Sequence, residues 1–510
     1  MRTGDELRVA DVVREYARSR GNHAAVRHGD ATLTYAQLDD RSNRLANALR
    51  ALGAGATSRV AYLGRSAPEV VELLFAVSKI GAVLVPLNWR LSTPELAAVL
   101  YDAGAPVLVA APPYLDVAAQ LARPRGVRVV AVGQEYERLL AADDATDPGR
   151  RGEAHDVVVQ MYTSGTTGVP KGVLTTHRNL AAAAETSPYW QFDAASVSLT
   201  PLPMFHIGGI GWAFLGLWHG ATTIIVSEFV AADVLDTIER ERVTNAVLVP
   251  TMLQLLTEVP GAADRDYSSL RSIAYGASPI TTPVLKAALR TFGCSFFGVY
   301  GLTESTGGVV HLEPQDHDPD GPRAHLLRAA GKPLPWVDLR VVDADSGADA
   351  KPHEVGEVWL RAPNVMAGYF NRPAETAAAL VDGWLRTGDG GFLDDEGYLF
   401  LTDRIKDMIV SGGENVYPIE VEEALAQHPD VAEVAVIGVP DERWGETVMA
   451  FVIPRPGAAP TADELVAHAR ERLAGYKLPR IVRLVDELPR TPSGKVLKRA
   501  LRERYAGAPI

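Results

Sequence analysis

The chain has 510 residues, 47% of them hydrophobic, and at about 150 residues per domain this length corresponds to about three folded units. Its 63 Asp and Glu residues against 50 Lys and Arg give a net charge of −13, which argues against nonspecific binding to nucleic acid or to anionic membranes. The single cysteine, Cys294, excludes an intramolecular disulfide and a Cys/His zinc cluster, and together with a charged N-terminus without a signal-peptide core it predicts a cytoplasmic protein.

The first two thirds of the chain alternate between apolar strands and amphipathic helices. Thr34 and Gln37 have the spacing of a capping box, and leucines at helical spacing follow until Gly53. Residues 58–64, 68–81 and 82–88 then read as strand, helix and strand, and the same rhythm returns over 245–301. Such alternation is typical of parallel, doubly wound sheets, so we expect two α/β layers before about residue 329.

Residues 194–227 contain no Asp, Glu, Lys or Arg, and this stretch is long enough to cross a bilayer. Pro201 and Pro203 interrupt it, and five glycines lower its helix propensity. We therefore expect a strand at 196–199, a short buried helix at 209–217 and a strand at 222–226, with no membrane span.

From about residue 330 the pattern changes to short alternating strands with Gly, Pro and Asp turns, which predicts a small β-barrel. After Asp403 the chain reads as another small unit of helices and strands. The predicted fold class is α/β, with a large N-terminal body over 1–403 (α/β subdomains to about 329, β-barrel over about 330–403) and a small α+β C-terminal domain over 404–510.

The segment 162–173, YTSGTTGVPKGV, follows a predicted strand and has the composition of a phosphate-binding loop. Hydroxyl groups and glycines let side chains and backbone N–H groups approach an anion, and a lysine adds positive charge. These residues are Thr163, Ser164, Gly165, Thr166, Thr167, Gly168 and Lys171. The spacing differs from that of the common P-loop, which has four residues between its glycines.

This segment resembles the nucleotide loop of the adenylate-forming superfamily, which contains acyl- and aryl-CoA synthetases, luciferases and the adenylation domains of peptide synthetases. Six further motifs of the superfamily follow in order: PLPMFH (201–206), YGASP (275–279), GVYGLTE (298–304), GWLRTGD (383–389), DRIKDMIVSGGENVYPIEVE (403–422) and PRTPSGK (489–495). The resemblance implies two half-reactions. A carboxylic acid and Mg²⁺·ATP give acyl-AMP and pyrophosphate, and the thiol of coenzyme A then forms the thioester.

The resemblance also implies roles for individual residues. Adenine is expected between YGASP and GVYGLTE, at Gly276, Ala277, Ser278, Gly298 and Gly301, with Tyr300 stacking on it. Thr303 is expected at the α-phosphate, Glu304 and Thr163 at Mg²⁺, and Asp389 with Arg404 at the ribose. The alternatives are that Tyr300 is a core aromatic residue, that Thr303 and Glu304 cap a helix, and that Asp389 forms a turn.

By the same resemblance, Lys495 contacts the carboxylate and the α-phosphate, and it counts with His206, Glu304 and Thr303 among the expected catalytic residues. The C-terminal domain is expected to rotate about a hinge at Asp403, so that Lys495 serves adenylation and then leaves room for the thiol. Ser411, Gly412, Gly413 and Glu414 would line the path of coenzyme A, with Trp444 and Lys477 as further candidates.

The acid pocket of the superfamily maps to His206, Ile207, Ile210, Trp212, Val249, Met252 and Val309. Amino-acid-activating relatives usually carry an Asp where this chain has His206, so an α-amino acid is disfavoured. These segments contain no arginine that could pair with a second carboxylate. A fatty, aryl or polycyclic monocarboxylic acid remains, which would place the protein in fatty acid or related acid metabolism.

Two other functions remain open on the sequence. The same adenylation could end in capture of the acyl group by an amine, as in an amide ligase, because the motifs of the first half-reaction are shared. The chain could also be a catalytically idle adenylate-binding protein, although it retains Lys495, Glu304 and Asp389. We expect a monomer or a homodimer.

Overall fold

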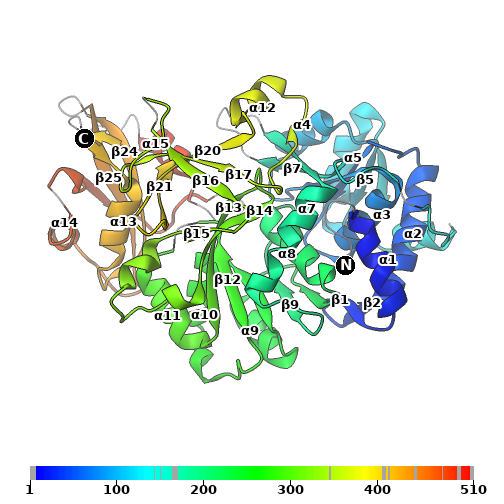
Figure 1. Ribbon diagram of the computed structural model, residues 1–510, viewed down its shortest axis with the longest axis horizontal. Helices are drawn as coiled ribbons and strands as arrows, with labels where there is room; N and C mark the ends of the chain where they lie inside the picture. Colours follow the sequence, from blue (N-terminus) through cyan, green and yellow to red (C-terminus); the bar gives the residue numbers. More distant parts are fainter. Residues whose placement is uncertain are drawn as a thin grey trace.

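The computed structural model of the protein describes residues 7–505 except 143, 150, 164–169, 279, 344–345, 405–408, 412–413, 442–444, 474 and 491–495. Figure 1 shows two α/β layers and a β-rich unit in the large body, with the C-terminal domain at one side. The predicted fold class is confirmed, and the charge-free stretch forms strand, helix and strand as expected. No described helix is long and apolar enough to cross a membrane.

The first layer is a seven-stranded sheet in the order β18-β8-β7-β4-β3-β5-β6, with its central strands parallel. Its strands are β3 (Arg59–Leu63), β4 (Val83–Leu87), β5 (Val107–Ala110), β6 (Arg128–Ala131), β7 (Val157–Thr163), β8 (Lys171–Thr176) and β18 (Gly368–Tyr369). Its helices are α2 (Tyr35–Ala51), α3 (Pro68–Ile80), α4 (Thr93–Ala103), α5 (Leu115–Ala122) and α6 (Gln134–Ala142). The predicted capping box is confirmed, because the Gln37 N–H donates to Thr34 Oγ1 (3.3 Å) and the Thr34 N–H donates to Gln37 Oε1 (2.9 Å).

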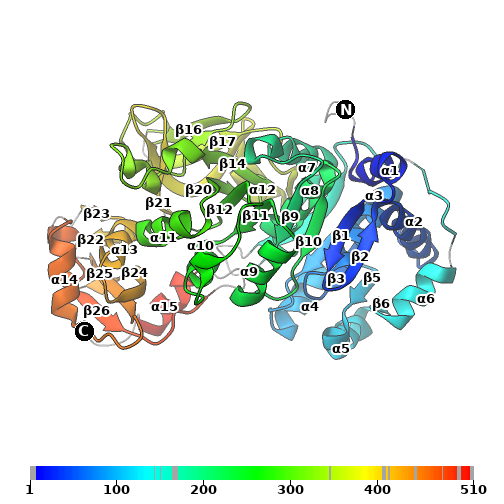
Figure 2. The same cartoon turned by 90° about the horizontal axis from the view of Figure 1, so that it is seen from below.

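The second layer is a nine-stranded sheet in the order β15-β14-β13-β12-β11-β9-β10-β1-β2. Its strands are β1 (Ala24–His28), β2 (Ala31–Thr34), β9 (Val197–Thr200), β10 (Thr222–Ile225), β11 (Asn245–Leu248), β12 (Ser272–Gly276), β13 (Ser295–Leu302), β14 (Gly307–Leu312) and β15 (Lys332–Pro333). Its helices are α1 (Val9–Ser19), α7 (His177–Ala184), α8 (Ile207–Trp218), α9 (Ala231–Arg240), α10 (Pro250–Thr257) and α11 (Thr282–Phe292). Buried residues of α1, α3, α7 and α8 form one core cluster that joins the two layers (Figure 2).

The β-rich unit is a five-stranded antiparallel sheet, and its apolar cluster also includes Val173 of β8 and Val309 and Val310 of β14. Its elements are β16 (Asp338–Val342), β17 (Gly356–Arg361), α12 (Pro373–Ala379), β19 (Leu380–Val381), β20 (Trp384–Leu393) and β21 (Leu399–Arg404). Short 3₁₀ helices lie at Pro112–Tyr114, Arg123–Arg125, Ser187–Trp190 (η3), Ala262–Asp264, Pro314–Asp316, Ala324–Arg328 and Gly475–Lys477.

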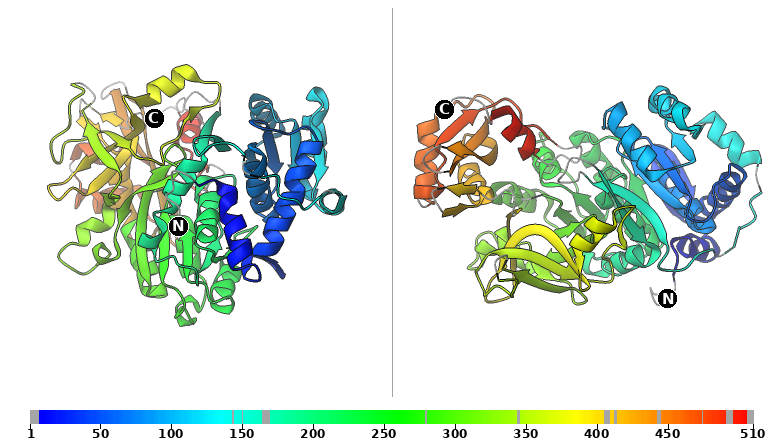
Figure 3. Two further views of the ribbon diagram at one scale, coloured as in Figure 1. Left: turned by 45° about the vertical axis from the view of Figure 1, so that its right-hand side comes forward. Right: turned by 90° about the horizontal axis from the view of Figure 1, so that it is seen from above.

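The C-terminal residues form a separate sheet with its own core, beside the large body (Figure 3). Its strands are β22 (Ile409–Ser411), β23 (Glu414–Val416), β24 (Val431–Asp441), β25 (Gly445–Pro454) and β26 (Ile481–Leu484). Its helices are α13 (Pro418–Ala426), α14 (Ala462–Arg470) and α15 (Lys498–Tyr505). Glu423 of α13 accepts a hydrogen bond from the hydroxyl of Thr282 on α11 at 2.8 Å, which links this domain to the body.

Candidate active site

The predicted phosphate loop connects two paired strands of the first layer. Thr163 ends β7 and Lys171 begins β8, and the two residues lie opposite each other in the antiparallel register. Ser164, Gly165, Thr166, Thr167 and Gly168 lie outside the described residues. The Lys171 ammonium lies 5.1 Å from the centre of the Tyr369 ring, so the cation expected at the phosphates lies over an aromatic face.

Tyr369 joins this lysine to the carboxylate expected at Mg²⁺. Its hydroxyl donates to Glu304 Oε1 at 2.9 Å, and its strand β18 pairs with β8 so that Tyr369 lies opposite Val173. The sequence did not predict Tyr369. No local pattern marks it, because only the pairing of β18 with β8 brings residues almost 200 positions apart together.

Tyr300 and Asp389, the residues expected at adenine and ribose, contact each other directly. The Tyr300 hydroxyl donates to Asp389 Oδ2 at 2.9 Å, although the two residues belong to different sheets. Asp389 lies within β20 and faces Arg404 of β21 in the register; the side chain of Arg404 lies outside the described atoms. A vicinal diol of a ribose would find this carboxylate already positioned beside the aromatic ring.

The backbones of YGASP and GVYGLTE approach each other closely at Gly276. A Cβ atom on Gly276 would lie 2.1 Å from the carbonyl oxygen of Val299, a distance that no side chain tolerates. Ala277 follows with a φ of 67°, in the left-handed region that non-glycine residues rarely adopt. Strained backbone of this kind clusters at ligand sites.

Thr303 and Glu304 lie in the turn between β13 and β14, and a strand follows them. The alternative in which they cap a helix is therefore wrong. A carboxylate with one oxygen held by Tyr369 suits Mg²⁺, which binds one or two carboxylates together with substrate phosphates and water. Within the described part of the chain, no group of three or more His, Cys, Asp or Glu could by itself hold a metal ion.

The residues expected at the acid pocket lie in different packing clusters. The core between the two layers contains Ile207, Ile210 and Trp212 of α8. Met252 of α10 packs on a cluster within the second layer, and Val309 of β14 lies in the cluster of the β-rich unit. Val249 precedes α10, which begins with Pro250. α8 is the element that runs from His206 into the protein interior.

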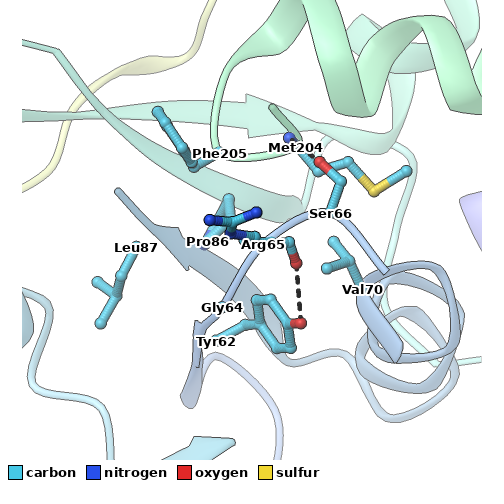
Figure 4. A pocket seen from close by; sticks show the side chains of 9 residues that line it. All are labelled: Tyr62, Gly64, Arg65, Ser66, Val70, Pro86, Leu87, Met204 and Phe205. Carbon is cyan, nitrogen blue, oxygen red and sulfur yellow. Dashed lines mark hydrogen bonds between the residues drawn. The ribbon is translucent and has the colours of Figure 1, made fainter. Parts of the chain in front are cut away.

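His206 directly precedes α8, and its ring lies 4.4 Å from that of Phe205. A small hollow that Phe205 helps to line lies at the ends of β3 and β4 (Figure 4). There the Met204 N–H donates to Ser66 Oγ at 3.1 Å, which ties the segment before His206 to the first layer. None of the nine residues that line the hollow is a predicted site residue.

For the expected path of coenzyme A, the structure describes two side chains. Ser411 is buried in β22, and the Lys477 ammonium pairs with Glu420 Oε2 at 2.6 Å. Gly412, Gly413 and Trp444, the side chain of Glu414 and the catalytic candidate Lys495 lie outside the described residues. Cys294 is half-buried against the apolar cluster of the second layer, and burial raises the pKa of its thiol to about 12.

Comparison with known proteins identifies the family of the chain. Residues 13–370 match the model of the AMP-binding enzyme family, and residues 420–495 match that of the AMP-binding enzyme C-terminal domain. The chain therefore belongs to the AMP-binding enzyme family.

Similar proteins include both kinds of ligase that the sequence left open. A feruloyl-CoA synthase from an Amycolatopsis species is 44% identical over 96% of this chain and 97% of its own length. A fatty acid–acyl-carrier-protein ligase from Streptomyces coeruleorubidus is 42% identical over 93% and 92%. The structure of an amide bond synthetase from Marinactinospora thermotolerans superposes with a TM-score of 0.88 at 34% identity, covering 98% of this chain and all of that one.

Proposed function

We propose that the protein is an AMP-forming ligase that activates a monocarboxylic acid with ATP and transfers the acyl group to coenzyme A. The observation that carries this proposal is two tyrosine–carboxylate pairs, Tyr300 with Asp389 and Tyr369 with Glu304, the second of them beside Lys171. These pairs provide an aromatic face and a diol acceptor for a nucleoside, and a cation and a hard carboxylate for phosphates.

The chemistry requires activation because a carboxylate resists attack by nucleophiles, and AMP supplies a good leaving group. A carboxylate oxygen of the acid attacks the α-phosphorus of ATP, the bond to pyrophosphate breaks, and the acyl-AMP remains bound. Tyr300 and Asp389 would orient the nucleoside, while Lys171 would offset phosphate charge. Mg²⁺ bound at Glu304, with Thr163 beside it, would neutralise charge on the phosphate oxygens.

In the second half-reaction, the sulfur of coenzyme A attacks the acyl carbon and AMP leaves with the bonding electron pair. We propose that the two steps use two orientations of the C-terminal domain, which would turn about Asp403. Asp403 lies next to the last residue of β21 in the body sheet, and β22, which begins at Ile409, already belongs to the C-terminal sheet; this change of sheet supports a pivot at Asp403.

The test of function combines ATP, Mg²⁺ and a panel of acids with either coenzyme A or amines, and identifies products by mass. We expect pyrophosphate release with at least one acid and a thioester as the product. An amide without any thioester would establish the second candidate function, which the similarity to an amide bond synthetase favours. No pyrophosphate release with any acid would leave an idle adenylate-binding protein.

Lys495→Ala tests the two-step mechanism. We expect acyl-AMP formation to fall by about 10²- to 10³-fold, because a preorganised cation at the developing charge is lost. Thioester formation from supplied acyl-AMP should persist. Lys351→Ala is the matched control, since its side chain is 82% exposed; equal loss of both steps in Lys495→Ala would contradict the mechanism.

A further inference from the structure

Three buried rings form a cluster at the middle of α8. Trp190 ends η3, Trp212 lies in α8 and His311 lies in β14. The centres of the Trp190 and Trp212 rings are 5.6 Å apart, and those of Trp190 and His311 are 5.2 Å apart. The two tryptophans are 4% exposed and His311 is 2% exposed. We call these three residues the indole–imidazole cluster.

The polar atoms of the indole–imidazole cluster lack protein partners among the described residues. The indole N–H groups of Trp190 and Trp212 donate to no acceptor there, and neither ring nitrogen of His311 has a hydrogen-bond partner. Each unmet buried polar group costs about 1–3 kcal/mol, and native proteins contain few of them. Four such atoms in three adjacent rings are therefore available for hydrogen bonds to a ligand.

His311 in this cluster can both donate and accept. Burial lowers the pKa of its imidazole to about 4, so the ring is neutral at pH 7. One nitrogen of a neutral imidazole donates while the other accepts. Together with two indole donors, the cluster is complementary to a hydroxyl group, which donates once and accepts at its lone pairs.

The cluster adjoins the candidate active site. His311 lies opposite Val299, the neighbour of Tyr300, in the β13–β14 register. Trp190 approaches β14 at Gly308, where an added Cβ would lie 3.4 Å from Trp190 Cζ2. Trp212 lies six residues after His206, which corresponds to about 9 Å along the axis of α8. An aryl-propanoic acid with its carboxylate near His206 would span this separation.

The position of Trp190 is fixed by buried hydrogen bonds. Its carbonyl oxygen accepts from Asn245 Nδ2 at 2.8 Å and from Ser272 Oγ at 2.7 Å, and both of these side chains are 0% exposed. The left-handed Gln191 then ends η3. These bonds fix the backbone of Trp190, and its ring packs against Trp212 and His311, so little conformational entropy remains to be lost on binding.

We propose that the indole–imidazole cluster binds the end of the substrate acid that is remote from the carboxylate. The cluster would select aryl acids that carry a phenolic hydroxyl at this end. The inference rests on the proposed ligase function and specifies its substrate class. A long saturated chain is disfavoured, because it would leave the donors of Trp190 and Trp212 and the nitrogens of His311 unmet.

The test compares 3-(4-hydroxyphenyl)propanoate, 3-phenylpropanoate and hexadecanoate as substrates, with pyrophosphate release as the readout. We expect wild-type kcat/KM to be about tenfold or more higher for the hydroxylated acid than for the unsubstituted one, as one hydrogen-bonded pair provides. Trp212→Phe keeps a ring but removes the N–H, so the ratio of kcat/KM for the hydroxylated acid to kcat/KM for 3-phenylpropanoate should fall towards one. Trp218→Phe on the same helix is the control and should keep the preference.

A second readout does not depend on turnover. The hydroxylated acid should raise the unfolding temperature of the wild type more than 3-phenylpropanoate does, and Trp212→Phe should abolish this difference. Trp190→Phe is the alternative if Trp212→Phe does not fold. Equal kcat/KM for the two aryl acids, preference for hexadecanoate, or an unchanged preference in both variants would overturn the inference. Absence of pyrophosphate release with every acid would instead refute the proposed function. The unfolding temperatures would still show whether the cluster prefers the hydroxylated acid.

Discussion

Two tyrosine hydroxyls determine how the candidate site is arranged. Tyr300 holds Asp389 and Tyr369 holds Glu304, each at 2.9 Å. A hydrogen bond to a charged acceptor contributes about 1.5–3 kcal/mol, more than a neutral pair does. Each carboxylate is therefore oriented by a residue from another part of the chain.

We predict that acyl-AMP formation by Tyr369→Phe requires a higher Mg²⁺ concentration. The ring that lies under Lys171 remains, but Glu304 loses the hydroxyl that orients it. The Mg²⁺ concentration for half-maximal acyl-AMP formation should rise by about tenfold, as the loss of one charge-assisted hydrogen bond implies. This concentration is measured by titrating Mg²⁺ at saturating ATP and following acyl-AMP formation.

Tyr398→Phe is the matched control for this variant. Its hydroxyl also donates to a carboxylate, that of Asp316 at 3.0 Å, but this pair contains no predicted site residue. An equal shift in both variants would show that Tyr369 acts only on stability.

At the scale of elements, the site lies where strands of different sheets end. β12 ends at Gly276 and β7 ends at Thr163, while β20 of the β-rich sheet contributes Asp389. The carboxyl ends of strands in open α/β sheets are where such proteins bind ligands. The close approach at Gly276 shows how tightly β12 and β13 must fit there.

We predict that Gly276→Ala disrupts this junction. The new methyl group would meet the Val299 carbonyl oxygen, and overpacking of this kind costs about 1–3 kcal/mol. The strand ends should separate, and kcat/KM for ATP should fall by about 10- to 100-fold for a strain of that size. Gly55→Ala is the control, since no atom lies within 4 Å of its added Cβ. Equal kcat/KM for ATP in Gly276→Ala and Gly55→Ala would show that the close approach at Gly276 does not matter for ATP binding.

At the scale of the whole molecule, one described hydrogen bond joins the body to the C-terminal domain between α11 and α13. Glu423 accepts it from Thr282, and burial raises the pKa of this carboxyl while the Thr282 hydroxyl opposes the shift. This hydrogen bond stabilises the observed orientation of the C-terminal domain relative to any orientation that lacks it.

We predict that Thr282→Val changes the two half-reactions unequally. Valine keeps the shape of threonine but removes the donor, so the observed orientation loses about 1–1.5 kcal/mol, or about five- to tenfold in population. The half-reaction that uses this orientation should slow by that factor, while the other should not slow. Acyl-AMP formation and thioester formation from supplied acyl-AMP are measured separately.

The control for this prediction is Thr237→Val, whose hydroxyl bonds within the surface helix α9. If Thr282→Val slows both half-reactions equally, the contact does not distinguish two orientations.

Much of the fold was predictable because its signals are local. The capping box at Thr34, the interrupted charge-free stretch and the change of pattern near residue 330 each follow from neighbouring residues. Tyr369 and His311 were not predictable, because their contacts depend on strands and rings that are distant in sequence. Trp212 was expected at the acid pocket, but not its unmet N–H beside Trp190.

The fold class, the family and the kinds of side chain available for phosphate, ribose and adenine follow from the sequence, because motifs preserve residue type and order along the chain. Only the tertiary structure decided which of these residues meet. Pairing of β18 with β8 places Tyr369 beside Lys171, and the Tyr369 hydroxyl then reaches Glu304 in the β13–β14 turn. A contact between sheets joins Tyr300 to Asp389, and packing of η3, α8 and β14 assembles the indole–imidazole cluster. Such contacts depend on distances in space, which spacing along the chain does not encode.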